Sequence, residues 1–92
     1  MAKTRAHVIV SGRVQGVFFR QNTKRQAQSQ GVYGWVKNLD DGRLEAVFEG
    51  EESGVKALVE FCRHGPRGAV VVDITVEWES FKGEFQSFDI AY

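Results

Sequence analysis

The sequence is poor in the residue types that form disulfides, metal sites and disordered segments. It contains one cysteine, one proline and two histidines among 92 residues. The single cysteine, Cys62, cannot form an intramolecular disulfide, and the His, Cys and carboxylate residues show no metal-site spacing. No low-complexity segment occurs. We therefore expect an ordered chain without a metal, in which Cys62 is a small core residue.

Signals for export and membrane insertion are also absent. The N-terminus has no apolar signal-peptide core, and no hydrophobic run is long enough to span a bilayer. The length suits one domain over residues 1–92, and its 42% hydrophobic and 26% charged residues are ordinary for a globular protein. We expect a cytoplasmic monomer with no membrane partner.

The formal net charge is zero, with 12 basic and 12 acidic residues. A nucleic-acid-binding protein usually has a basic excess, so we expect no nucleic-acid partner. The basic residues are concentrated early in the chain, whereas residues 40–52 are mainly acidic. The early basic group comprises Arg13, Arg20, Lys24, Arg25 and Lys37. A local positive surface on a neutral protein suits a small anion better than a polymer.

Hydrophobic periodicity predicts alternating strands and helices. Period-two patterns indicate strands at residues 5–12, 34–39, 43–49 and 69–78, with a short fifth at 87–91. A helix is predicted over 20–30, stopped by Gly31. A second helix begins with Ser53 as its cap and ends at Gly65-Pro66.

The same patterns predict the core. Buried positions are expected at Ala6, Val8, Val10, Leu44, Ala46, Phe48, Val55, Leu58, Val59 and Cys62, and on the alternation Val70, Val72, Ile74, Val76, Trp78. The element order predicts an α+β, ferredoxin-like split β-α-β sandwich. Two helices should cover one face of an antiparallel sheet, with a short extra C-terminal strand.

The segment Gly12–Arg20 has the layout of an anion-binding cradle. It joins a strand to a helix, contains two glycines, and ends with an arginine. Backbone N–H groups in such a loop, with a helix N-terminus behind them, can bind an anion. Arg20 in the first helical turn opposes the helix dipole at a cost of ~0.3–1 kcal/mol, which a bound phosphate would reverse. Arg20 as a solvated surface residue is an equally good interpretation of position alone.

Asn38 is the second candidate, near the end of the second predicted strand. In a split β-α-β unit this position can lie close to the end of the first strand. The amide could then hold a water with its oxygen while its NH₂ faces an anion. Spacing alone favours the simpler interpretation of Asn38 as a turn residue.

Two runs of residues resemble the two signatures of the acylphosphatase family. The first is Gly12–Arg20, and the second is Gly34–Asn38 followed by Gly42 and Gly50. They occur in the right order and spacing, and the resemblance covers essentially the whole chain, including Gly65-Pro66. The departures include Gln30, where a helix-face leucine is expected, and they leave Arg20 and Asn38 untouched.

The resemblance implies hydrolysis of an acyl phosphate to a carboxylate and inorganic phosphate, without a metal or cofactor. Arg20 and Asn38 would be the catalytic residues, with Asn38 positioning the attacking water. The implied phosphate-binding groups are the Arg20 side chain and the backbone N–H groups of Gln15, Gly16, Val17, Phe18, Phe19 and Arg20. Phe19 is also expected in the core.

Two non-catalytic alternatives share the predicted fold. RNA-binding domains have the same element order, but their third strand is rich in aromatics, whereas residues 43–49 here are acidic with one phenylalanine. A regulatory or maturation module acting on a partner is the other alternative. Retention of both Arg20 and Asn38 argues against an inactive scaffold.

Overall fold

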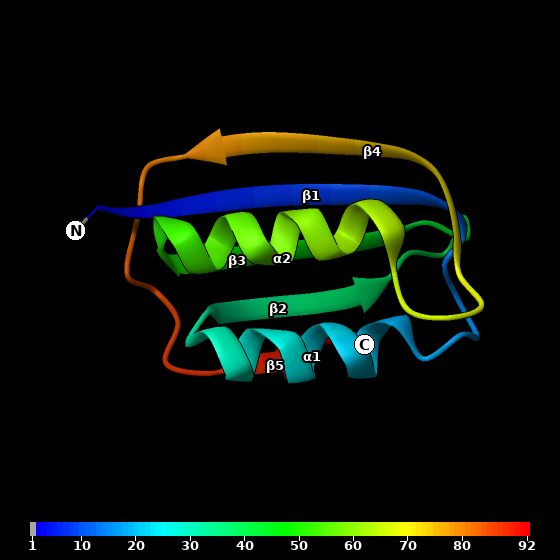
Figure 1. The fold of residues 1–92 in the computed structure, drawn as a ribbon, viewed down its shortest axis with the longest axis horizontal. Coiled ribbons are helices and arrows are strands. Elements are labelled where there is room, and N and C mark those ends of the chain that lie inside the picture. Colours follow the sequence, from blue (N-terminus) through cyan, green and yellow to red (C-terminus); the bar gives the residue numbers. More distant parts are fainter. Residues whose placement is uncertain (1) are drawn as a thin grey trace.

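Residues 2–92, which the computed structural model describes, form two layers, with two helices on one face of a five-stranded sheet (Figure 1). The strands are β1 (Lys3–Arg13), β2 (Tyr33–Asn38), β3 (Leu44–Glu51), β4 (Val70–Glu79) and β5 (Phe88–Ile90). The helices are α1 (Phe19–Gln30) and α2 (Glu52–His64). This arrangement confirms the predicted ferredoxin-like α+β fold.

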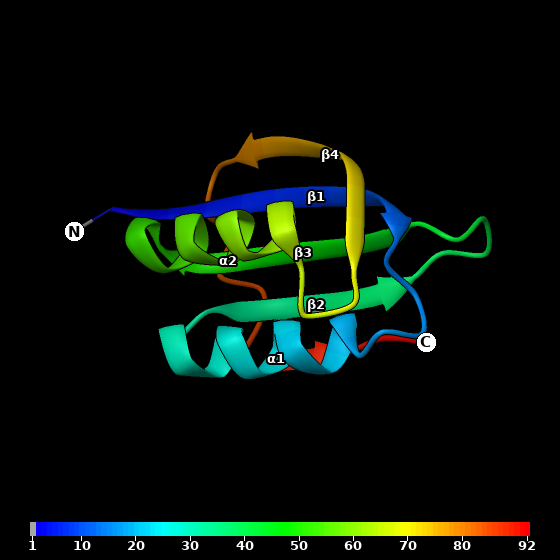
Figure 2. The same cartoon turned by 45° about the vertical axis from the view of Figure 1, so that its right-hand side comes forward.

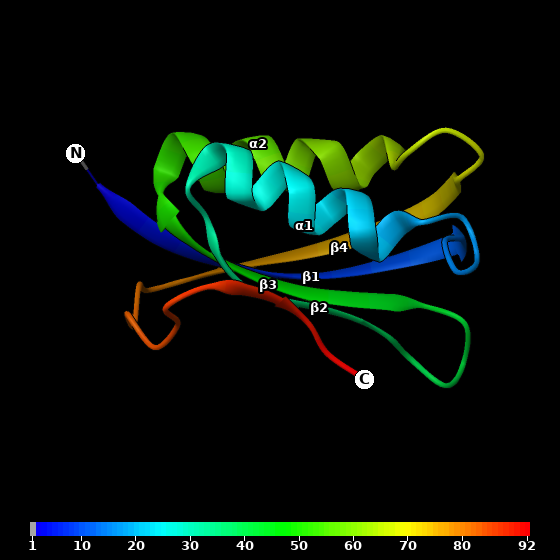
Figure 3. The ribbon, with the colours of Figure 1, turned by 90° about the horizontal axis from the view of Figure 1, so that it is seen from below.

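The strand order is β4-β1-β3-β2-β5. The first four strands pair antiparallel, but β5 runs parallel to β2. The sheet is therefore mixed: the four longer strands are antiparallel as expected, and the short C-terminal strand, whose direction was not predicted, runs parallel to β2. The reason is the connection over residues 80–87, which crosses the face away from the helices before β5 begins (Figure 3). A crossing of this kind delivers the last strand in the same direction as β2.

The core lies between the sheet and the helices. All ten core residues predicted on the first strand, the third strand and the second helix are buried. Gly31 ends α1 in the left-handed conformation, as expected of a glycine after a helix. Ser53 does not cap α2, because the helix begins at Glu52, whose N–H donates to the Ala2 carbonyl. The backbone carbonyl that immediately precedes β1 thus takes the place of a side-chain cap.

The alternation predicted for β4 is wrong at its beginning and also at Trp78, which is 50% exposed. Val70 and Val72 are 56% and 75% exposed, and Val71 packs against the core instead. A register shift in the β1–β4 pairing occurs between Ser11 and Gly12, opposite this part of β4. One extra residue in a strand moves the following side chains to the other face. The bulge, which sequence periodicity does not reveal, decides which valines are buried.

An ion-pair cluster at the far end of the sheet fixes the 80–87 connection. Arg5 contacts Glu49 at 3.2 Å, Glu79 at 2.9 Å and also Glu84. Glu49 is 2% exposed and accepts backbone N–H bonds from Lys82, Gly83 and Glu84. Burial alone would raise the pKa of Glu49, but these N–H groups and the Arg5 guanidinium outweigh it, and the pKa lies below its ordinary value.

We predict that Glu49→Gln lowers the free energy of unfolding by about 2 kcal/mol at pH 7, because charged hydrogen bonds to a buried carboxylate are lost. Since the folded-state pKa is depressed, this stabilisation is present above pH 4.5 and is lost as the pH falls further. Urea denaturation of both proteins at several pH values measures it. The exposed Glu77→Gln, at a position without an ion pair within residues 2–92, serves as control and should leave the midpoint unchanged. A difference that persists undiminished at pH 2 would contradict the assignment.

Candidate active site

The site is built where β1 turns into α1. Gly12 has φ +123°, and a Cβ there would lie 2.2 Å from the Val70 carbonyl oxygen, so only glycine fits beside β4. Gly16 has φ +73° with open space where a side chain would be. Together they let the chain leave the sheet in a loop over residues 14–18. The loop backbone around Gly16 is open to an approaching ligand.

Phe18, immediately before α1, has a left-handed backbone with φ +60° and ψ +26°. Such a conformation costs about 1–3 kcal/mol in a residue other than glycine, and it is often found at functional sites. No side chain caps α1, and no acidic residue stands in its first turn. The first N–H groups of the helix therefore keep the partial positive charge that attracts anions.

The sheet brings Asn38 to this loop. Leu44 of β3 pairs with Val10 of β1 on one side and with Asn38 of β2 on the other. Neighbouring strands lie about 4.8 Å apart, so Val10 and Asn38 are separated by about two strand spacings at one end of the sheet. Asn38 shares a strand face with the buried Val36, which is the face that the helices cover.

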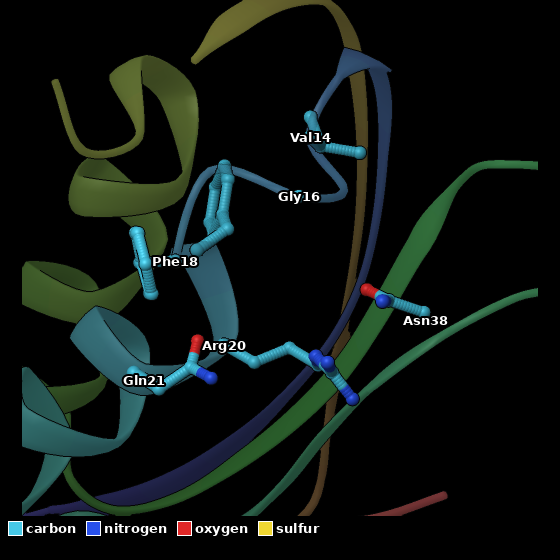
Figure 4. Close-up of a pocket in the computed structure, with 7 residues that line it drawn as sticks. Val14, Gly16, Phe18, Arg20, Gln21 and Asn38 are labelled. Atoms are coloured by element: carbon cyan, nitrogen blue, oxygen red, sulfur yellow. The ribbon is translucent and has the colours of Figure 1, made fainter. Parts of the chain in front are cut away.

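A cavity of about 210 Å³ lies between the loop and the end of β2 (Figure 4). Its lining residues are Val14, Gly16, Phe18, Phe19, Arg20, Gln21 and Asn38. Cavities for drug-sized ligands are larger, at ~300–1,000 Å³, so this one suits a small group. In Figure 4 the Arg20 side chain extends from α1 toward the side of the cavity where Asn38 lies.

The oxygen of the Asn38 side chain is buried and unpaired. Within residues 2–92, Oδ1 of Asn38 has no hydrogen-bond partner. A buried acceptor without a partner costs about 1–3 kcal/mol, and such atoms are rare in folded proteins. Its place beside the cavity makes it an acceptor available to a molecule bound there.

Arg20 contacts an aromatic ring instead of a carboxylate. Its Cζ lies 5.4 Å from the centroid of Tyr92, and within the described chain Arg20 forms no ion pair. The Ala91 N–H donates to the Val36 carbonyl at 2.8 Å and holds the chain end beside β2. Figure 2 shows the C-terminus near the loop that enters α1. The guanidinium thus keeps its charge free for an anion.

The other residues predicted for phosphate binding divide into three groups. Gly16, Phe18 and Phe19 line the cavity, and Phe18 is 71% exposed. Phe19 is buried, as expected, and contacts Phe61 edge-on, while Val17 packs against the core. The Gln15 side chain does not line the cavity.

Three residues at or beside the site were not predicted from the sequence: Val14, Gln21 and Tyr92. Val14 and Gln21 flank predicted residues, and their type carries no signal for a site. Tyr92 lies far from Arg20 in the sequence, so only the pairing of β5 with β2 brings them together.

Histidines and carboxylates lie outside the cavity. His7 contacts Glu45 at 2.6 Å across the β1–β3 pairing, and His64 is exposed beside Glu60. Within residues 2–92, no three His, Cys, Asp or Glu side chains are grouped to hold a metal ion. None of the helices in this range is long and apolar enough to cross a membrane. The charged chemistry of the cavity therefore rests on Arg20.

Comparison with known proteins agrees with the fold. The family model for acylphosphatase matches residues 6–90. The chain is similar to the acylphosphatase of Haloarcula marismortui, at 61% identity over 83 residues, which cover 90% of this chain and 91% of the relative. It is also 50% identical to the Pelotomaculum thermopropionicum acylphosphatase over the full length of both. The crystal structure of the Bacillus subtilis acylphosphatase superimposes with a TM-score of 0.92 at 38% identity, covering 97% of this chain and 99% of that one.

The fold and the cavity define a class of small ferredoxin-like α+β domains with an open strand–helix loop and an arginine-lined cavity at one end of the sheet. Within this class, the sequence and structural matches are decisive. The chain belongs to the acylphosphatase family, and it is a hydrolase whose substrate class is small acyl phosphates.

Cys62 lies in the core on α2, and burial raises its pKa to about 12. We predict that a thiol reagent such as DTNB does not label Cys62 in the native protein at pH 8 and labels it stoichiometrically in 6 M guanidinium chloride, because the buried thiol cannot form a thiolate. Rapid labelling of the native protein would contradict the packing of α2 on the sheet.

Proposed function

We propose that the Gln15–Arg20 loop binds the phosphoryl group of an acyl phosphate, and that Asn38 positions the water that attacks it. The observation that carries this proposal is the unpaired Oδ1 of Asn38 beside a cavity that Arg20 also lines. One group can bind an anion and the other can accept a hydrogen bond from water.

The positive end of the site supports phosphoryl binding. Arg20 presents a planar guanidinium that matches two phosphate oxygens at once. The uncapped start of α1 and the open loop at Gly16 offer backbone N–H groups. Phosphoryl transfer spreads negative charge over the equatorial oxygens, so hydrogen-bond donors arranged around the phosphoryl group stabilise the transition state.

Asn38 supports attack by water. Its Oδ1 can accept one O–H of a water and thereby direct the lone pair of the water oxygen toward phosphorus. Asn38 does not itself take up a proton at neutral pH, so its contribution is orientation. The water adds to phosphorus while the P–O bond to the acyl group breaks, and inorganic phosphate and a carboxylate leave.

The leaving group explains why so few groups suffice. A carboxylate leaves as the conjugate base of an acid with a pKa of ~4, so it needs little protonation. Positioning and charge stabilisation are then the main requirements. We propose that the reaction uses no metal or other cofactor, and that the loop recognises the phosphoryl group.

We further propose that the protein acts as a cytoplasmic monomer that binds neither nucleic acid nor membranes. The balanced charge and the acidic third strand, with Glu45, Glu49 and Glu51, support the absence of an RNA partner. Tight, salt-dependent binding of RNA would favour the alternative of a non-catalytic module.

We predict that Arg20→Lys lowers kcat/KM for a simple aromatic acyl phosphate by at least about 100-fold, because lysine does not reproduce the bidentate contact of a guanidinium with two phosphate oxygens. Phosphate release in excess chelator measures the rate, and circular dichroism should show an unchanged fold. Arg25→Lys, on an exposed position of the same helix, is the matched control and should retain the wild-type rate. Near-full turnover by Arg20→Lys would remove Arg20 from the reaction.

We predict that Asn38→Ala lowers kcat about 100-fold while the inhibition constant of inorganic phosphate changes less than about threefold, since water and phosphate contacts are separable. The free energy of unfolding should not fall, because Oδ1 makes no hydrogen bond within the described chain. Steady-state kinetics and urea denaturation test both statements. A weakened phosphate affinity with normal kcat would contradict the assignment.

A further inference from the structure

We infer that Gln15 is a positioning residue, whose carboxamide holds the phosphate-binding loop in register with the hairpin that carries Asn38. This inference rests on the proposed function and adds a residue to it. Gln15 was expected to contribute to phosphate binding. That expectation concerned its backbone N–H, whereas its side chain donates to the β2–β3 hairpin and is absent from the cavity lining.

Two hydrogen bonds carry the inference. Nε2 of Gln15 donates to the Leu39 carbonyl at 2.8 Å and to the Arg43 carbonyl at 3.0 Å. Both hydrogens of the amide are thereby used. The Leu39 N–H also donates to the Arg43 carbonyl at 2.8 Å, so the two acceptors belong to one closed hairpin end.

The position of these acceptors explains what the contact does. Leu39 directly follows Asn38, so a bond to its carbonyl fixes the backbone at the residue that would hold water. Gln15 directly precedes Gly16 in the loop that would hold phosphate. Within residues 2–92, no other hydrogen bond outside the sheet joins loop 14–18 to hairpin 39–43. A misplacement of about 1 Å between reacting groups can cost about 100-fold in rate, so this link sets the geometry of attack.

Glutamine is the side chain that this link requires. Both partners are carbonyl oxygens, which only accept, so a double donor without charge satisfies them. An ionised glutamate of the same shape would place negative charge against two carbonyl oxygens. A protonated glutamate could restore one of the two donors.

The test uses two variants and two readouts. We expect Gln15→Met, which has a similar length and no donor, to lower kcat about tenfold while the inhibition constant of inorganic phosphate stays within about twofold. We expect Gln15→Glu to lower kcat further at pH 7.5 and to recover toward pH 5, because the two facing carbonyl oxygens raise the pKa of the introduced carboxylate above its ordinary ~4.3 and it becomes protonated. The ratio of variant to wild-type kcat is measured at each pH, so that the pH dependence of the common machinery cancels.

Matched controls separate positioning from other roles. Gln26→Met and Gln26→Glu, on an exposed position of α1, should leave kcat and its pH profile unchanged. A purely structural Gln15 would lower the unfolding midpoint and leave kcat unchanged in the folded variants. A direct phosphate ligand would raise the inhibition constant in parallel with KM. Either result would overturn the inference.

The same data separate this inference from the proposed function. An active wild type with unchanged kcat in both Gln15 variants would overturn only the role of Gln15. A folded wild type without hydrolysis above the uncatalysed rate would overturn the proposed function, and the role of Gln15 with it. A Gln15→Glu ratio that stays constant from pH 5 to pH 7.5 would also contradict the requirement for a donor.

Discussion

The pairing of Leu44 with a residue on each side is the constraint on which the site depends. Because Leu44 pairs with both Val10 and Asn38, the C-terminal ends of β1 and β2 are held at the same end of the sheet. The strand that separates them also sets their distance, at about two strand spacings. Every functional group of the site follows from this arrangement: the loop leaves from β1, Asn38 ends β2, and α1 packs over β2 and β5.

Three energetically unfavourable local features lie at that end of the sheet. Phe18 has a left-handed backbone, Arg20 stands at the positive end of a helix, and Oδ1 of Asn38 is buried without a partner. Each feature costs stability in the folded protein, and each would become favourable or useful with the proposed anion and water bound. The Arg5–Glu49 cluster at the other end of β1 has the opposite character, because its buried groups are paired.

The C-terminal segment runs from the Arg5–Glu49 cluster at one end of the sheet to the cavity at the other end. Glu49 holds residues 82–84 against the open face of the sheet, and β5 then pairs with β2. The chain end reaches Arg20 as a result, with the Tyr92 ring over the guanidinium. Val47 and Glu49 are buried for the same reason, although the alternation of the third strand places them on the face away from the helices.

The sequence by itself determined the element order, the helix-facing core and the two residues with distinct chemistry, Arg20 and Asn38. These features depend on periodicity, on turn residues and on motifs, all of which are local in the chain. Only the tertiary structure decided which valines of β4 are buried, that β5 runs parallel to β2, and that the Gln15 side chain contacts the hairpin instead of the cavity. Each of these depends on a bulge, a crossing connection or a contact between distant segments, where the partner and not the residue type sets the outcome.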